Sequence, residues 1–167
     1  MAKIALLLEN AYQDLEVWYP ALRLREAGHQ VVFVAPKAEE TYTGKYGYPA
    51  ISDLAIAYAK PHNFDAVIIP GGFAPDYMRR APGMVEFVRD MWNADKVVAA
   101  ICHGGWMLAS AEIVEGKKLT SFFAIKDDMV HAGANWVDEE TVVDGKLITA
   151  RKPEDLPVFC KAILNAL

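Results

Sequence analysis

Short apolar runs alternate with longer segments of mixed polarity along this chain. Residues 4–8, 31–35, 66–69 and 97–101 are apolar throughout, which is typical of strands buried on both faces of a parallel sheet. Residues 14–27 and 84–92 lie between these runs and have a helical pattern. Alternating strands and helices predict an α/β fold, in which helices cover both faces of a mostly parallel sheet.

The helix predicted over residues 14–27 has signals at both ends. Asp14 is the expected N-cap, and Gly28 is expected to close the helix in a left-handed conformation. The helix is predicted to be amphipathic, and its apolar side carries Leu15, Trp18, Tyr19, Leu22 and Ala27.

The remaining segments are shorter. Residues 41–52 combine glycines and a proline with aromatic residues, which indicates turns and a short antiparallel excursion. Asp144-Gly145 separates two short runs, 141–143 and 147–149, and predicts a two-residue hairpin. We also expect a short strand at 119–120, one or two helical turns at 125–132, and a closing helix at 153–167 with Pro153 near its first turn.

Composition indicates a globular protein and narrows its partners. At 167 residues, with 53% hydrophobic and 23% charged residues, the chain is expected to form one domain over residues 1–167. The formal net charge is −5 and no basic stripe is present, which argues against a nucleic-acid partner.

Cysteine usage and the N-terminus bear on the cellular compartment. Cys102 and Cys160 are the only cysteines, too few for a disulfide framework, so a cytoplasmic location fits best. Cys160 lies in the apolar stripe of the last helix and is expected in the core. The chain enters its first strand at once without a signal-peptide pattern. It has no apolar run long enough to span a bilayer, so no membrane partner is expected.

The segment Ile101-Cys102-His103-Gly104-Gly105 carries the strongest chemical signal. A predicted buried strand ends at Cys102, and small residues lead into a helical pattern at 106–111. At such a turn the thiol should stand clear of the sheet, and the N-terminal amides of the helix favour the reactive thiolate. A lone cysteine is more often a small hydrophobic residue of the core. The elbow context favours a reactive cysteine, with a pKa below that of a free thiol.

Two glycines follow another strand at the same predicted edge of the sheet, where open α/β sheets bind their ligands. Gly71 and Gly72 would let backbone N–H groups approach a ligand, and with the His103 amide they predict an oxyanion hole. A simple turn is the alternative. Residues 43–48, which include Lys45, are too short and irregular for a phosphate-binding loop.

Glu16 and the histidines allow more than one interpretation. Glu16 stands in the first turn of its helix. It is either a solvated carboxylate favoured by the helix dipole or a buried, protonated carboxyl that hydrogen-bonds the thiol. His103 directly follows Cys102, so its ring reaches the sulfur only if the chain bends. The other histidines lack metal-ligand spacing, and neither a metal nor a cofactor is expected.

Together these motifs resemble the PfpI intracellular-protease branch of the DJ-one/ThiJ/PfpI superfamily. The matching segments are Cys102-His103-Gly104, Pro70-Gly71-Gly72, and residues 43–48, 125–129 and 135–138, in order over essentially the whole chain. The resemblance implies a flavodoxin-like three-layer α/β sandwich with a strained nucleophile-elbow cysteine. It also implies a homo-oligomer: a dimer or, often in this branch, a hexamer built as a trimer of dimers.

The resemblance also assigns roles to residues of this sequence. Cys102 matches the nucleophile, His103 the histidine of a protease triad, and Glu16 the carboxyl that hydrogen-bonds the cysteine. Gly72 and the His103 amide match the oxyanion hole. In this branch the third triad member is a glutamate that follows Ala-Pro in a neighbouring subunit. Here Ala-Pro is followed by Asp76.

Three positions depart from the branch. Asp76 is one methylene shorter than the glutamate, Phe122 stands where a tyrosine is frequent, and Trp106 follows Gly105 where a proline is usual. We expect Trp106 and Phe122 to help form the substrate pocket. The departures weaken a peptidase more than an enzyme that acts on small carbonyl compounds.

The expected function is that of a cysteine-dependent PfpI-type hydrolase, a peptidase whose thiolate attacks a carbonyl. One alternative is a glutathione-independent glyoxalase or deglycase that acts on methylglyoxal or its adducts. Another, from a different class, is an oxidative-stress sensor that holds Cys102 as a sulfinate. Each function uses the same thiolate, so the sequence leaves all three open.

Overall fold

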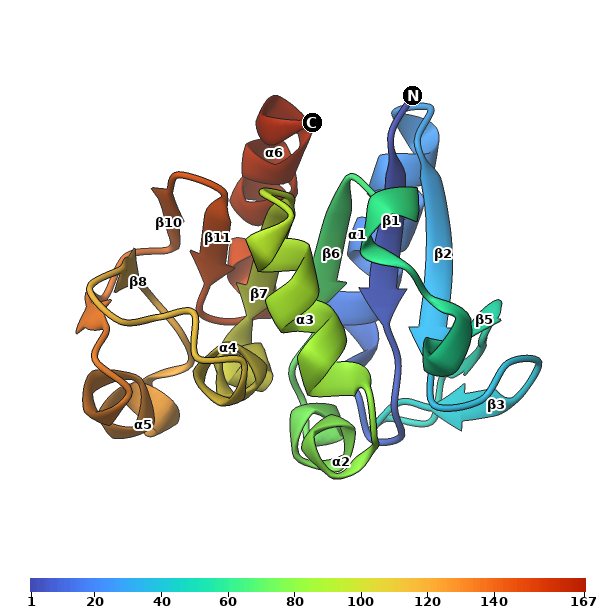
Figure 1. The fold of residues 1–167 in the computed structure, drawn as a ribbon, viewed down its shortest axis with the longest axis horizontal. Helices are drawn as coiled ribbons and strands as arrows, with labels where there is room; N and C mark the ends of the chain where they lie inside the picture. Colours follow the sequence, from blue (N-terminus) through green and yellow to red (C-terminus); the bar gives the residue numbers. More distant parts are fainter.

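A seven-stranded sheet forms the centre of the computed structural model, which describes residues 1–167 (Figure 1). The strand order is β10-β11-β7-β6-β1-β2-β5, and every pairing is parallel except that of β10 with β11. The strands are β1 (Lys3–Leu7), β2 (Gln30–Ala35), β5 (Leu54–Ala55), β6 (Ala66–Ile69), β7 (Val97–Ile101), β10 (Thr141–Asp144) and β11 (Leu147–Ala150). The predicted mostly parallel α/β sheet is confirmed.

Helices cover both faces of this sheet. In Figure 1, α1 (Asp14–Glu26) and α6 (Leu156–Ala166) lie behind the sheet, where they pack against each other. The helices α2 (Ala74–Arg80), α3 (Met84–Asn93) and α4 (Gly105–Ser110) lie in front of it. The remaining helix, α5 (Lys126–His131), packs against α4. The central strands β6 and β7 are therefore buried at every residue, which explains their uninterrupted apolar sequences.

Two small sheets complete the fold. One is the antiparallel pair β3 (Thr41–Thr43) and β4 (Pro49–Ile51), which confirms the predicted excursion. The other pairs β8 (Lys118–Leu119) with β9 (Asn135–Trp136) in parallel. The hairpin predicted at Asp144-Gly145 joins β10 to β11, and Gly145 takes the positive φ of 61° that the tight turn requires. The short helix α2 and the edge strand β5 were not predicted.

Helix α1 corrects two expectations. Its N-cap is Gln13, whose side-chain oxygen accepts hydrogen bonds from the N–H groups of Leu15 (2.7 Å) and Glu16 (3.3 Å). Asp14 is the first helical residue, and its carboxylate accepts two N–H groups of the 44–48 loop instead. The second correction concerns the buried side of the helix. Leu15 and Leu22, predicted on the apolar side, are 55% and 59% exposed.

The buried side of α1 is formed by a different set of apolar residues. Val17, Ala21 and Leu24 are fully buried and follow one another at helical spacing. The sequence pattern therefore indicated the wrong side of the helix, because apolar residues occur on both sides and only packing in the fold selects the side that is buried.

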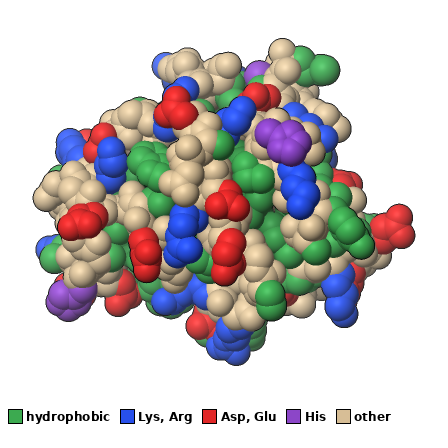
Figure 2. Space-filling view, in the orientation of Figure 1, with side chains coloured by type: hydrophobic (Ala, Val, Ile, Leu, Met, Phe, Trp, Pro, Cys, Tyr) green, Lys and Arg blue, Asp and Glu red, His purple; other side chains and the backbone are tan.

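The molecular surface is mixed in charge. Acidic and basic side chains are interspersed over the face shown in Figure 2, without a continuous basic patch. None of the helices combines the length and the apolar character needed to cross a membrane. Cys160 is 1% exposed on α6, so its predicted position in the core is confirmed.

Candidate active site

The elbow is a local distortion at the end of β7. Cys102 has a φ of +60°, a left-handed conformation that side chains other than glycine rarely adopt. Such a conformation costs on the order of 1–3 kcal/mol and persists only where the surrounding structure enforces it. A single 3-10 turn, Cys102–Gly104, then leads into α4. The predicted nucleophile elbow at a strand-to-helix turn is confirmed.

Gly71 and Gly104 allow the close approach that holds the elbow. A Cβ on Gly104 would lie 2.6 Å from the carbonyl oxygen of Ile69. A Cβ on Gly71 would lie 2.7 Å from Glu16 Oε2, 2.8 Å from Cys102 Cβ and 2.9 Å from the His103 nitrogen. Gly71 therefore stands at the point where the carboxyl, the thiol and the elbow amide converge, and no larger residue fits there.

The segment after β6 is also tied to the segment after β1. The N–H of Gln13 donates to the Gly71 carbonyl (3.2 Å), and the N–H of Phe73 donates to the Ala11 carbonyl (2.9 Å). Gly72 has a φ of +72°, and a Cβ there would lie 2.4 Å from the Gln13 nitrogen. The Pro-Gly-Gly sequence is thus more than a simple turn, because it brings the ends of two neighbouring strands together.

Cys102 lies at the edge of a cavity of about 340 Å³. The residues that line it are Gln13, Glu16, Lys45, Gly72, Phe73, Cys102, His103, Phe122 and Pro153. Cys102 is only 7% exposed. The low exposure reflects the aromatic and loop residues that line the cavity together with Cys102.

His103 bends back alongside the sulfur. Its Nδ1 lies 3.3 Å from Cys102 Sγ. The ring stacks on Phe122, with 5.0 Å between ring centres, and meets the edge of Trp106 at 5.1 Å. Burial lowers the pKa of His103, as does the charge of Lys45, whereas the charge of Asp128 raises it. A neutral imidazole at this distance can accept the thiol proton.

Glu16 is a buried carboxyl and not a solvated carboxylate at the start of its helix. It has no exposed surface, its Oε2 accepts the N–H of Gly71 at 2.7 Å, and its Oε1 has no hydrogen-bond partner. Burial raises the pKa of Glu16 to about 7, although hydrogen bonds from Gly71 and Cys102 lower it. A carboxyl of this kind exchanges its proton near neutral pH.

The ionisation of the thiol depends on the charge of this carboxyl. Burial and, after it, the charge of Glu16 raise the pKa of Cys102 to about 12. Hydrogen bonds from the backbone N–H groups of His103 and Gly72 lower it. The expectation of a depressed Cys102 pKa is wrong, because burial outweighs the two amides. The thiolate is therefore favoured when Glu16 is protonated and its negative charge is absent.

A profile of the DJ-1/PfpI family matches residues 2–166. The chain belongs to the DJ-1/PfpI family. It is 42% identical over 165 residues to Deglycase PH1704 of Pyrococcus horikoshii, across 99% of each chain. It is also 42% identical over 167 residues to Protein/nucleic acid deglycase 2 of Escherichia coli, across 99% of this chain and 97% of the relative.

A solved structure from Anabaena variabilis shares the architecture. That two-domain protein contains DJ-1/ThiJ/PfpI-like and ferritin-like domains, and it matches with a TM-score of 0.97 at 44% identity. The match covers 99% of this chain and 48% of that one, so this chain spans about half of its length. Named enzymes among the relatives, together with the elbow cysteine, identify this family member as an enzyme with a cysteine nucleophile.

Two residues expected in the site of this DJ-1/PfpI protein lie beside its cavity. Trp106 backs the His103 ring, donates from Nε1 to Asp128 at 2.7 Å, and lines a neighbouring hollow that also contains Asp76. Asp76 forms an ion pair with Arg80 of its own helix. Asp76 does not line the Cys102 cavity of its own chain, so its role across a subunit interface stays a prediction.

Other lining residues were not predicted. Gln13, Lys45, Phe73 and Pro153 line the cavity. Gln13 precedes the helix that carries Glu16, which is a position where a capping side chain is common, and this signal could have found it. Lys45, in the family-matching segment 43–48, and Phe73 were not assigned to the site, because their loops reach the cavity only through the tertiary fold.

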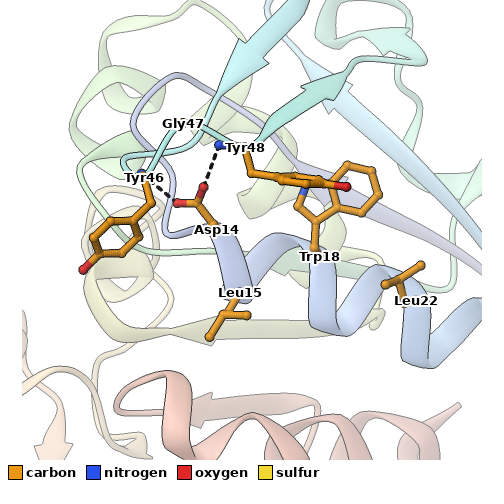
Figure 3. Close-up of a pocket in the computed structure, with 7 residues that line it drawn as sticks. All are labelled: Asp14, Leu15, Trp18, Leu22, Tyr46, Gly47 and Tyr48. Atoms are coloured by element: carbon orange, nitrogen blue, oxygen red, sulfur yellow. Dashed lines mark hydrogen bonds between the residues drawn. The ribbon is translucent and has the colours of Figure 1, made fainter.

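A second, more open groove lies on the outer side of α1 (Figure 3). It has a volume of about 580 Å³ and is lined by Asp14, Leu15, Trp18, Leu22, Tyr46, Gly47 and Tyr48. Figure 3 shows Asp14 at its end, hydrogen-bonded to the backbone of Tyr46 and Tyr48. The exposed leucines of α1 belong to this groove and not to the core.

Proposed function

We propose that this protein is a glutathione-independent glyoxalase and deglycase that acts on methylglyoxal and its adducts. One observation carries the proposal. The strained Cys102 faces a small cavity beside a neutral histidine and a buried carboxyl whose pKa is about 7. The deglycase names of the relatives support this alternative over the peptidase expected first.

The first step is addition of Cys102 to the aldehyde. The thiol proton passes to His103 Nδ1, and the sulfur forms a bond to the carbonyl carbon as the C=O π pair moves to oxygen. The backbone N–H groups of Gly72 and His103, which hydrogen-bond the sulfur, would stabilise the negative oxygen. Protonation of this oxygen, from Glu16 or His103, gives a hemithioacetal.

The second step is an isomerisation that needs no external oxidant. A base removes the proton from the carbon bonded to sulfur, and reprotonation of the adjacent carbon gives a thioester, so one carbon is oxidised as the other is reduced. Water then cleaves the C–S bond and releases lactate and the free thiol. Glu16 is suited to move this proton, because general acids and bases work best with a pKa near the working pH.

Peptide hydrolysis has weaker support in this chain. A protease histidine needs a group that orients its ring, and the ring contacts described for His103 are with Phe122 and Trp106. Phe122 also lacks the hydroxyl of a tyrosine, which could hold a peptide carbonyl. A peptidase would therefore need the carboxylate of Asp76 from a neighbouring subunit.

We propose in addition that the protein is a homo-oligomer. The groove on α1 supports this, because Leu15, Leu22 and Tyr48 are each more than half exposed there. Contiguous exposed apolar residues of this size are typical of contact surfaces between proteins. A second copy that covers this groove would lie next to the loop that carries Lys45.

The test is turnover of methylglyoxal without glutathione, measured by loss of the aldehyde and by appearance of lactate. We expect wild type and Cys160→Ser to be equally active, and Cys102→Ser to lose at least about 1000-fold of the rate. A fluorogenic peptide assayed in parallel should give little activity. Turnover that survives in Cys102→Ser, or that appears only with the peptide, would overturn the proposal.

A further inference from the structure

Lys45 is the one lysine or arginine that lines the Cys102 cavity. Its ammonium takes part in none of the ion pairs of the structure. Nζ lies 5.0 Å from the centre of the Tyr46 ring, and a contact with an exposed aromatic face leaves the N–H donors free for a ligand. An unpaired cation therefore stands at the rim of the cavity.

The loop that carries Lys45 is fixed from both sides. The N–H of Lys45 donates to the Tyr12 carbonyl at 2.8 Å. The carboxylate of Asp14 accepts the N–H groups of Tyr46 and Tyr48, each at 3.0 Å (Figure 3). A Cβ on Gly44 would lie 2.4 Å from Asp14 Oδ1, so the loop closes on this carboxylate only with glycine there. These contacts hold the Lys45 backbone beside the cavity.

The charge of Lys45 acts on the reacting groups. It lowers the pKa of both Glu16 and His103, the two side chains beside the sulfur, which line the same cavity as Lys45. His103 is neutral at pH 7, and Glu16, with a pKa of about 7, is largely neutral below that pH. Lys45 is then the remaining charge of the cavity, and it is positive.

We propose that Lys45 is a specificity-determining residue that selects compact carbonyl compounds bearing a carboxylate. This inference rests on the proposed carbonyl chemistry of Cys102. A cavity of about 340 Å³ has ample room for a small molecule such as glyoxylate. Its carboxylate would pair with Lys45 while the Cys102 sulfur bonds to the aldehyde carbon. The thiol proton ends on the new hydroxyl, and the carboxylate is unchanged.

Charge selection can be measured without turnover. Iodoacetate and iodoacetamide both alkylate a thiolate with loss of iodide, and they differ mainly in that iodoacetate is negatively charged. The ratio of their rates at Cys102 therefore reports the local charge, and the thiolate fraction cancels. We expect Lys45→Met to lower this ratio about five- to tenfold and Lys45→Arg to restore it. Raised salt should shrink the difference.

Lys60→Met is the matched control, because Lys60 is also an exposed lysine and lies outside the cavity. Its ratio should equal that of wild type. An unchanged ratio in Lys45→Met would overturn the proposal, and so would an equal fall in Lys60→Met, since the effect would then belong to the overall charge of the protein.

A second arm uses reversible protection of Cys102 from iodoacetamide. We expect Lys45→Met to raise the concentration of glyoxylate that gives half-protection about five- to tenfold. The concentration of neutral methylglyoxal that gives half-protection should change less than about twofold. Equal changes for both aldehydes would contradict charge selection. Because neither arm requires turnover, a protein that fails to convert methylglyoxal would still show the Lys45 effect, and the two proposals fail separately.

Discussion

The two cysteines of this chain lie in opposite kinds of environment although they look alike by burial. Cys102 is 7% exposed and Cys160 is 1% exposed, and burial raises the pKa of each thiol to about 12. Cys160 lies on α6 within the packed core. Cys102 has a left-handed backbone, a cavity on one side, and two backbone N–H groups directed at its sulfur.

The comparison shows that neither exposure nor thiol pKa identifies the reactive cysteine. What differs is access for a small molecule, and the presence of groups that can take the proton and stabilise an anion. Glu16 and His103 supply the proton acceptors only at Cys102. A thiol with a raised pKa can still react when an adjacent group accepts its proton during the attack.

The largest expected difference is in the alkylation rate. In single-cysteine variants, Cys160→Ser should react with iodoacetamide at Cys102 roughly 100-fold faster than Cys102→Ser reacts at Cys160, because only Cys102 is reached from a cavity. Intact-mass measurement at pH 8 gives both rates. Comparable rates would show that the elbow confers no reactivity, and the comparison would fail.

Glu16→Gln tests the coupled carboxyl through stability. A carboxyl whose folded pKa is about 7, against about 4.5 in the unfolded chain, stabilises the fold below pH 4.5, and that contribution is lost as pH rises to 7. Wild type should therefore lose about 2–3 kcal/mol of unfolding free energy between pH 5 and 8 that Glu16→Gln keeps. Chemical denaturation at both pH values measures the difference.

The same variant should change Cys102 and leave Cys160 alone. Removal of the Glu16 charge removes a cause of the raised Cys102 pKa, so the pH midpoint of its alkylation should fall by about one to two units. The midpoint of Cys160 should not move. Identical pH profiles in wild type and Glu16→Gln would mean that the carboxyl and the thiol are not coupled.

Gly71→Ala tests the packing that holds the elbow. A methyl group there meets Glu16, Cys102 and His103 at under 3 Å, so these groups must separate. We expect alkylation of Cys102 to slow about tenfold and unfolding free energy to fall by about 1–3 kcal/mol. Cys160 in the same variant is the internal control. A rate at Cys102 like that of wild type would show that the elbow tolerates displacement.

The smallest effect is expected for Asp76→Ala. The Asp76–Arg80 pair is partly exposed, with side-chain exposures of 28% and 65%, so its loss should cost about 1 kcal/mol or less, and alkylation of Cys102 should change less than about twofold. Light scattering shows whether the oligomer of Asp76→Ala is intact. The peptide and methylglyoxal assays then test whether Asp76 acts in the site of a neighbouring subunit. Loss of peptide hydrolysis with an intact oligomer would show that Asp76 completes a neighbouring site, and retention of both activities would exclude this.

The sequence by itself determined the features that depend on neighbouring residues. The apolar runs of β6 and β7 required strands buried on both faces, and Asp144-Gly145 required a tight hairpin. The apolar run that ends at Cys102 and continues into small residues specified the elbow. In each case a short segment carries its own conformational preference, so no distant contact was needed to recognise it.

Only the tertiary structure decided the chemistry around the sulfur. Four features depend on segments distant in the chain: the buried side of α1, the His103 ring beside the thiol, the effect of the Glu16 charge on the Cys102 pKa, and the place of Lys45 at the cavity. Burial sets the pKa values, and burial is a property of the packed whole. The local sequence around a residue predicts its backbone conformation well. It predicts poorly the dielectric environment in which the fold places the side chain, and that environment sets the pKa.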